Sequence, residues 1–329
     1  MSSEKQTKKT DGEEMNNVKV SFLSICCYRL CYVFSLLPLR VMYVMADMLY
    51  FLLYDVLRYR RKIVRSNLTI SFPEKSKDEI RRIERKFYHW LSDYFFESIK
   101  LLSISKEEAQ RRFTFVNPEV FSDAFDGGQN IGTILGHYCN WEWLSCTQYY
   151  MPEGSVLGLI YKPLSNDVMD YIFYKLRSHA HGVAIPKKDI LRYLVKYKRE
   201  GVMNLFGYIA DQAPKWENIH LWIPFMGHET GVFTGAERIM RKMNDAVYYV
   251  EMGRPRRGYY TCTLRLITKE PNTLEEYEIT RRFFKMLEEN IRQHPEYYLW
   301  THNRWKRTHE EFDQRFTEVN GKVIKRSET

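Results

Sequence analysis

A histidine and a glutamate separated by four residues are the side chains of this sequence best suited to chemistry. They occur in the segment Gly136-His137-Tyr138-Cys139-Asn140-Trp141-Glu142, between a strand-like apolar run at 131–135 and a helix-like stretch at 141–150. On one helix they would lie about 140° apart, so we expect them to meet across a strand-to-helix turn with Asn140 as the N-cap. A carboxylate that accepts from one imidazole nitrogen leaves the other free as a base. The spacing therefore predicts removal of a proton from a hydroxyl that attacks an activated acyl group.

Spacing alone leaves two other interpretations of this segment open. A histidine near a glutamate can form a purely structural pair. The thiol of Cys139 could act as a nucleophile, but its neighbours Tyr138 and Trp141 are bulky and neutral and do not indicate a lowered thiol pKa. These neighbours favour a packing role for Cys139.

The motifs of several other enzyme classes are missing. The sequence has no G-x-S-x-G, G-x-x-x-x-G-K-[ST], G-x-G-x-x-G or H-E-x-x-H segment, so serine hydrolases, P-loop enzymes, Rossmann oxidoreductases and zinc proteases lack support. His179 and His181 have no further ligand at metal-binding spacing, and the six cysteines form no Cys-x-x-Cys unit. We therefore expect neither a disulfide framework nor a metal or other cofactor.

Strand-like and helix-like segments alternate through most of the 329-residue chain. The strand-like runs lie at 131–135, 156–161, 202–209, 246–252 and 259–267, and the helix-like stretches at 76–102, 141–150, 167–180, 187–199, 234–243 and 274–293. This alternation predicts an α/β fold with a mixed, largely parallel sheet layered by helices. The last two apolar runs are expected to form an antiparallel hairpin.

The N-terminal part of the chain contains a long apolar segment at 20–57. Four charged residues interrupt it before about 18 uncharged residues accumulate, so a single membrane span is a poor fit. They are Arg29, Arg40, Asp47 and Asp55. With Pro38 as a break, the segment is typical of a helical hairpin that lies in one leaflet. A hairpin packed against the core through a polar seam is the alternative.

Four regions follow from these patterns: a disordered tail at 1–17, a membrane-associated helical hairpin at 18–62, a catalytic domain at 63–310 and a polar C-terminal tail at 311–329. The formal net charge of +9 favours anionic partners such as phospholipid headgroups or acidic carrier proteins. No recognition motif for nucleic acid accompanies the basic clusters, so nucleic acid is not expected as a partner.

Several segments, in the same order, resemble one protein family. The segment GHYCNWEW resembles the H-x4-[DE] block of the glycerolipid acyltransferase superfamily, and specifically of its lipid A biosynthesis acyltransferase branch. The other matching segments are Asn67-Leu68 with Phe72-Pro73, Tyr161-Lys162-Pro163 with Asn166, Asp170 and Arg177, Asp211-Gln212, Pro224-Phe225 with Gly227 and Thr234-Gly235, and the stretch from His294 to His302 with Arg304-Trp305-Lys306. Cys139 departs from the family pattern, which usually has glycine there, and Asn303 replaces a frequent basic residue.

The resemblance implies a glycerolipid-acyltransferase-like fold and transfer of a fatty acyl group without a metal. The donor would be a thioester on acyl carrier protein or coenzyme A, and the acceptor a hydroxyl of a lipid A precursor. His137 and Glu142 are then the catalytic pair. Substrate binding falls to Arg177, Asp211, Lys162 and Asn140, with Arg177 facing phosphate or phosphopantetheine. The expected location is the cytoplasmic face of the inner membrane.

Two other functions are compatible with the same residues. The acceptor could be another membrane lipid, such as an amino-acid-linked acyl lipid or a lysophospholipid, because the chemistry would be identical. The chain could also be a catalytically silent protein that binds membrane surfaces, although an intact His137 and Glu142 argue against this alternative.

Overall fold

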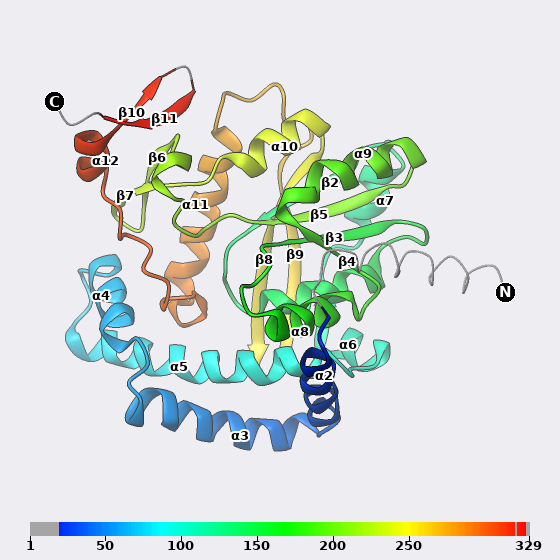
Figure 1. Cartoon of the computed structure of the whole chain (residues 1–329), viewed down its shortest axis with the longest axis vertical. Helices are drawn as coiled ribbons and strands as arrows, with labels where there is room; N and C mark the ends of the chain where they lie inside the picture. Colours follow the sequence, from blue (N-terminus) through cyan, green and yellow to red (C-terminus); the bar gives the residue numbers. More distant parts are fainter. Residues whose placement is uncertain (1–19, 320, 327–329) are drawn as a thin grey trace.

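A seven-stranded sheet forms the centre of the structure, with the strand order β1-β9-β8-β2-β5-β3-β4. The computed structural model describes residues 20–319 and 321–326 (Figure 1). The strands are β1 (Phe113–Phe115), β2 (Ile131–Leu135), β3 (Val156–Tyr161), β4 (Val183–Pro186), β5 (Asn204–Ile209), β8 (Ala246–Arg256) and β9 (Tyr259–Thr268). Neighbours are parallel except for β8 and β9, which form an antiparallel hairpin. The predicted mixed, largely parallel α/β sheet is confirmed.

The central strands are apolar because both of their faces are covered. All five residues of β2 are buried, as expected for a parallel strand with layers on either side. Successive side chains of a strand point to opposite faces. Gly132 and Gly136 therefore face Met240 and Leu287, which belong to α10 (Gly235–Met243) and α11 (Glu278–Gln293).

Helices connect the strands and cover the sheet (Figure 1). Besides α10 and α11 they are α4 (Arg61–Ser71), α5 (Lys77–Lys100), α6 (Lys106–Arg112), α7 (Glu119–Phe125), α8 (Asp167–Ser178) and α9 (Ile190–Glu200), with shorter turns η4 (Lys187–Asp189), η5 (Trp216–Asn218) and η6 (Pro295–Tyr297). The longest, α5, starts at a capping box in which Ser76 and Glu79 exchange hydrogen bonds. The predicted helix at 141–150 is a 3₁₀ helix, η3 (Trp141–Tyr150).

The N-terminal apolar segment forms two helices that pack on different parts of the molecule. They are α2 (Phe22–Ser35) and α3 (Leu39–Phe51), and α3 continues into a π-helical turn, η2 (Leu52–Val56). Pro38 is the N-cap of α3, as its fixed backbone predicts. Helix α2 packs on α8, whereas α3 lies along α5, which separates it from the sheet (Figure 1).

Among the described residues, no single helix is long and apolar enough to cross a membrane. The helices Phe22–Ser35 and Leu39–Val56 reach that length and apolar character only as a pair, which is bent by 112° at the break.

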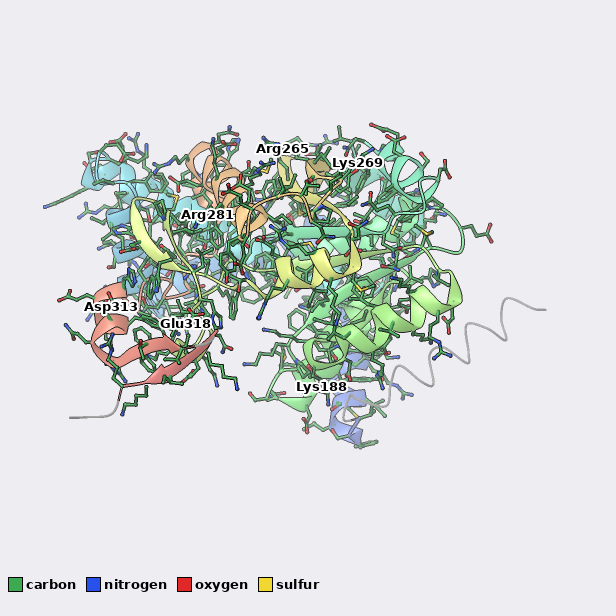
Figure 2. All side chains as sticks on the ribbon, turned by 90° about the horizontal axis from the view of Figure 1, so that it is seen from above. Lys188, Arg265, Lys269, Arg281, Asp313 and Glu318 are labelled. Carbon is green, nitrogen blue, oxygen red and sulfur yellow. The ribbon has the colours of Figure 1, made fainter. Side chains whose placement is uncertain are left out.

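The C-terminal region contains regular structure where the sequence predicted a polar tail from 311. It forms α12 (His309–Arg315) and the hairpin of β10 (Phe316–Val319) and β11 (Lys322–Lys325). Phe312, Phe316 and Val323 are buried there with Ile219. Figure 2 shows Asp313 and Glu318 on this unit, at one end of the molecule. A second hairpin, β6 (Trp222–Phe225) with β7 (His228–Gly231), lies nearby. Nothing in the sequence indicated this local packing, because the apolar residues among 311–329 are few and widely spaced. The predicted tail at 1–17 lies outside the described residues.

Candidate active site

The residues that could take part in a reaction lie together at one edge of the sheet. His137 follows β2, Asp211 follows β5, Lys162 follows β3 and Lys187 follows β4. These four strands are parallel and adjacent in the order β2-β5-β3-β4. Their carboxyl ends therefore meet at one edge, where open α/β sheets bind their ligands.

His137 is held by Asp211 from the neighbouring strand. Its Nδ1 lies 2.6 Å from Asp211 Oδ1, and Asp211 also accepts a hydrogen bond from the backbone N–H of His137. An ionised carboxylate only accepts, so Nδ1 carries the proton and Nε2 has the free lone pair. Nε2 accepts a hydrogen bond from the side-chain amide of Gln212 at 3.2 Å. This tautomer makes Nε2 a proton acceptor at the surface of the site.

Asp211 remains ionised although it is only 2% exposed. Burial by itself would raise the pKa of this carboxyl. Attraction to the His137 imidazole and the two hydrogen bonds from that residue outweigh burial, with help from the guanidinium of Arg304, and the pKa is lowered. A buried negative charge directed at one imidazole nitrogen orients the ring and stabilises its protonated form.

A glycine lets α11 pack closely against the end of β2. A Cβ at Gly136 would lie 2.8 Å and 2.9 Å from the methyl carbons of Leu287 and 3.5 Å from Asp211 Cβ. Contacts below 3.0 Å would require the Leu287 side chain to shift. Glycine therefore fits the packing at position 136, directly before the histidine.

Glu142 is paired with Arg177 and not with His137, which corrects the predicted histidine–glutamate contact. Arg177 donates through Nε to Glu142 Oε2 at 3.0 Å and through Nη2 to Oε1 at 2.7 Å. Trp141 Nε1 donates to the same Oε1 at 3.1 Å. The indole of Trp141 also packs edge-on against the His137 ring, with centroids 4.9 Å apart. Trp141 therefore contacts both Glu142 and His137 and lies between them.

Arg177, predicted as a phosphate ligand, lines a cavity beside His137 and is paired there with Glu142. Two of its nitrogens are committed to Glu142, and its guanidinium lies over the rings of Tyr161 and Phe173 at 5.5 Å and 5.2 Å. Burial lowers the pKa of this arginine, but the charge and hydrogen bonds of Glu142 more than compensate, and the pKa is raised. The bidentate pair removes the net charge from this part of the wall.

We refer to residues 136–142 as the catalytic turn. Two of its residues, Asn140 and Cys139, have structural roles. Asn140 precedes η3 but makes no side-chain cap. Its side chain is fully buried and donates to Glu97 Oε2 at 3.2 Å, so its predicted substrate contact is wrong. Cys139 is also fully buried, and burial raises the pKa of its thiol to about 12. Its φ of 56° lies in the left-handed region, which glycine adopts without strain.

The C-terminal signature holds the catalytic turn in place. Tyr297 O accepts from Cys139 N at 2.8 Å, and His137 O accepts from Leu299 N at 3.1 Å. Asn67 of α4 donates to the carbonyls of Trp300 and His302, each at 2.9 Å. The sequence blocks around 67 and 300 thus meet in space, and their role is to clasp the turn.

An apolar cavity of about 670 Å³ lies beside His137. Thr133 and Leu135, the residues of β2 that alternate with the buried glycines, line it. Its lining also includes Phe115, Cys262 and Leu264 from β1 and β9. Gly207 of β5 lines it as well, and a Cβ there would meet Thr133 Oγ1 at 3.6 Å. The cavity therefore has the character of a site for a hydrocarbon chain.

Four of the predicted site residues line the cavity: His137, Glu142, Lys162 and Arg177. Lys162, predicted as a substrate ligand, is exposed there. Lys187 and Gln212, for which the sequence predicted no role, also line it, and Lys187 Nζ lies 4.9 Å from the centre of the Phe233 ring. Lys187 directly follows β4 and Gln212 lies in the loop after β5, so the order of the parallel strands would have pointed to both residues. Among the described residues, no group of three or more His, Cys, Asp or Glu side chains could hold a metal ion.

Fold and site together define an α/β protein in which a histidine held by an aspartate lies beside an apolar cavity. Residues 16–307 match the family model of the bacterial lipid A biosynthesis acyltransferases, so the chain belongs to this family and is an acyltransferase. The family predicted from the sequence motifs is confirmed.

Curated relatives cover most of the chain. It is 25% identical over 274 residues to the lipid A biosynthesis lauroyltransferase of Escherichia coli (strain K12), which spans 82% of this chain and 87% of that protein. It is 21% identical over 258 residues to the lipid A biosynthesis palmitoleoyltransferase of the same organism, which spans 76% and 80%. A lipid A biosynthesis acyltransferase of Shigella flexneri gives the same values.

The hydrogen bond between His137 and Asp211 can be tested without an activity assay. In protein labelled with 15N-histidine we expect one downfield imidazole Nδ1–H resonance, absent in His137→Ala and shifted upfield in Asp211→Asn, because a neutral amide is a weaker acceptor than a carboxylate. Glu142→Gln should leave its position unchanged. A resonance that responds to Glu142→Gln and ignores Asp211→Asn would restore the pairing predicted from the sequence.

Proposed function

We propose that this protein transfers a fatty acyl group from an acyl thioester to a hydroxyl of a lipid A precursor, with His137 as general base. The observation that carries the proposal is the imidazole of His137, whose Nδ1 is fixed by Asp211 and which lines an apolar cavity together with Gln212, the partner of its Nε2. The family match supports lipid A as the acceptor. The donor thioester is carried by acyl carrier protein or coenzyme A.

The proposed reaction needs no covalent enzyme intermediate. Nε2 of His137 takes the proton of the acceptor hydroxyl as its oxygen attacks the thioester carbonyl carbon. The C–S bond then breaks, and the leaving thiolate takes the same proton back from the imidazolium. An ester and a free thiol result, and Asp211 stabilises the positive ring between the two proton transfers.

The cavity accounts for the acyl chain of the donor. Leu, Ile and Phe side chains form much of its wall, and each methylene moved from water into such a wall contributes about 0.8 kcal/mol. A thioester whose chain fills the cavity would present its carbonyl near His137. The pairing of Glu142 with Arg177 keeps this wall free of an uncompensated charge.

Lys162 and Lys187 are suited to the anionic parts of the substrates. Both are exposed and line the cavity. A phosphate of the acceptor, or the phosphopantetheine of the donor, would find two cations near the entrance, and the net charge of +9 favours an acidic carrier protein.

We further propose that α2 and α3 attach the enzyme to the cytoplasmic face of the inner membrane. Their outer surface exposes large apolar side chains, among them Phe22 (84%), Leu30 (71%), Met48 (67%) and Phe51 (59%). Exposed basic residues accompany them at Arg29, Arg40, Arg58 and Arg60. This combination fits an interface that contains anionic lipid.

A different membrane lipid is the alternative acceptor. The base, its aspartate and the cavity would act identically on the hydroxyl of an amino-acid-linked acyl lipid or a lysophospholipid. Only the headgroup contacts would differ. The two acceptors are distinguished by assaying both with one donor.

Removal of the base or its partner should abolish transfer. We expect His137→Ala and Asp211→Asn to lower kcat by about 10³–10⁴-fold with little change in KM, because the proton acceptor or its orientation is lost. The measurement is transfer from acyl carrier protein thioesters to a lipid A precursor in mixed micelles.

Cys139→Gly is the matched control for these variants, since glycine adopts the backbone of that position without strain. It should retain kcat within about threefold. Full activity of His137→Ala would contradict the role of His137 as general base. Loss of activity in folded Cys139→Gly would instead favour the Cys139 thiol as a nucleophile.

A larger side chain at Gly207 should shorten the preferred acyl chain. Leucine there would project between Thr133 and Leu135, into the cavity. Because one methylene in an apolar pocket changes discrimination by about 10-fold or more, Gly207→Leu should favour shorter donors by at least this factor in kcat/KM. Gly207→Ala is the control and should differ little. Unchanged chain-length preference in Gly207→Leu would place the acyl chain elsewhere.

The membrane attachment can be measured by cosedimentation with vesicles. We expect binding to vesicles with anionic lipid, and a loss of about 10-fold or more in Met48→Gln/Phe51→Gln, since burial of each side chain contributes about 1.5–3 kcal/mol. Val195→Gln on α9, where Val195 is 54% exposed, is the control. Equal binding of all three proteins would exclude α3 as the attachment surface.

A further inference from the structure

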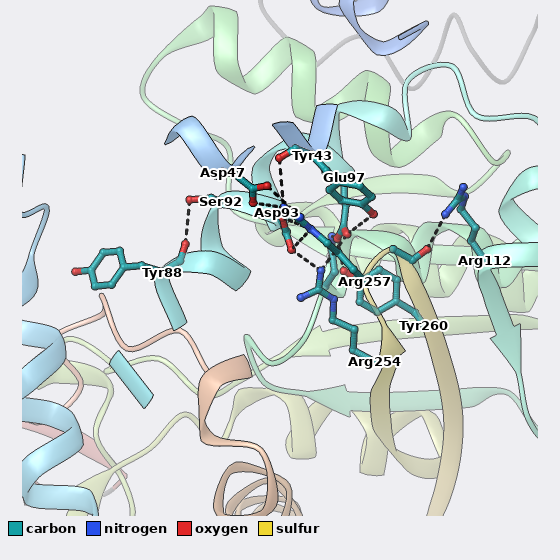
Figure 3. A network of polar contacts seen from close by, with 12 residues as sticks. Tyr43, Asp47, Tyr88, Ser92, Asp93, Glu97, Arg112, Arg254, Arg257 and Tyr260 are labelled. Carbon is teal, nitrogen blue, oxygen red and sulfur yellow. Dashed lines mark hydrogen bonds and ion pairs between the residues drawn. The ribbon is translucent and has the colours of Figure 1, made fainter. Parts of the chain in front are cut away.

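Glu97 of α5 is a buried carboxylate that contacts the catalytic turn from outside the site described above. Its side chain is 0% exposed. Oε1 accepts from the Tyr43 hydroxyl at 2.8 Å and from Arg254 Nη2 at 3.3 Å, and Oε2 accepts from the Tyr260 hydroxyl (Figure 3). Oε2 also accepts from Asn140 Nδ2 at 3.2 Å. A carboxylate offers about four acceptor sites, so its hydrogen-bonding capacity is fully used.

The donors to Glu97 come from three separate parts of the chain. Tyr43 belongs to α3, Arg254 and Tyr260 to the β8–β9 hairpin, and Asn140 to the catalytic turn. Asn140 Oδ1 is buried and has no hydrogen-bond partner. The orientation of the Asn140 side chain therefore depends on its contact with Glu97.

The same network extends to the outer surface of α3. Arg254 also donates to Asp93 at 2.6 Å, and Arg257 joins Asp93 to Asp47 of α3, each at 2.6 Å (Figure 3). The guanidinium of Arg257 lies 4.3 Å from the centre of the Tyr43 ring. Buried charges with this many hydrogen bonds fix the relative positions of the elements that carry them.

We propose that Glu97 is a positioning residue for acyl transfer, which holds the catalytic turn through Asn140 and links this turn to α3 through Tyr43. Glu97 is absent from the cavity lining, so its effect on the reaction passes through the turn to His137, three residues before Asn140. The inference rests on the proposed role of His137 as the base.

An exchange of donor and acceptor tests the contact directly. Glu97→Gln and Asn140→Asp each keep the size of the side chain, and each should lower kcat by about 10–100-fold with KM changed less than about threefold, because small displacements of a base reduce rate more than binding. The double variant Glu97→Gln/Asn140→Asp restores an amide that donates to a carboxylate. It should recover at least about 10-fold of the loss in kcat of either single variant.

The pH profile gives a second measurement that a merely structural role would not change. In Asn140→Asp two carboxylates face each other, with Asp93, Arg254, Tyr43 and Tyr260 around Glu97. Repulsion is relieved only when the two carboxylates share a proton, so kcat of this variant should fall with rising pH relative to the wild type. The double variant should regain the wild-type profile.

Glu84 provides the matched control. It lies on the same helix, is 0% exposed, and pairs with Arg61 and Arg65. Glu84→Gln should lower the melting temperature but leave kcat within about threefold, since neither Glu84 nor its partners Arg61 and Arg65 line the cavity or contact the catalytic turn. Tyr43→Phe removes one hydroxyl from Glu97 and should lower kcat by about 2–5-fold, consistent with the loss of one hydrogen bond.

The outcomes separate this inference from the proposed function. Inactive His137→Ala together with recovery in the double variant supports both. Inactive His137→Ala with wild-type kcat in folded Glu97→Gln, or equal losses in Glu84→Gln and Glu97→Gln, overturns the positioning role alone. Wild-type kcat in Tyr43→Phe overturns the link to α3. Active His137→Ala overturns the proposed function itself.

Discussion

The contact between His137 and Asp211 is the interaction on which the rest of the site depends. Two adjacent parallel strands, β2 and β5, end at the same edge of the sheet and bring an imidazole within 2.6 Å of a carboxylate that is almost fully buried. A negative charge in such a place is costly unless it is paired. The pair therefore satisfies a requirement of folding and fixes the tautomer of the histidine at once.

The residues around this pair hold the turn that carries His137 in place. Gly136 lets α11 approach the strand end, and the backbone of residues 297–299 clasps the turn that carries His137. Behind the turn, Asn140 contacts the carboxylate of Glu97. Polar networks in a low dielectric are rigid when they are satisfied, which explains why so many charged residues are buried in one region. Rigidity of this kind is what a proton acceptor needs to meet an incoming hydroxyl.

The two acidic residues near His137 have different partners. Asp211 contacts the imidazole, whereas Glu142 neutralises Arg177 in the wall of an apolar cavity. An unpaired guanidinium or carboxylate would be unfavourable in that wall. The H-x4-E spacing thus combines the histidine with a residue that shapes the cavity. This arrangement suits a family whose relatives are named for acyl chains of different length.

The sequence by itself determined the α/β class, the family and the position of His137 after a buried strand, because alternating apolar runs and local motifs are properties of contiguous residues. Only the tertiary structure decided that Asp211, 74 positions away, and not the nearby Glu142, holds the imidazole. It also turned Asn140 inward to Glu97 and ordered the C-terminal hairpin. The physical reason is that partners of a side chain depend on which strand ends become neighbours, and strand order is set by packing over the whole chain and not by local spacing.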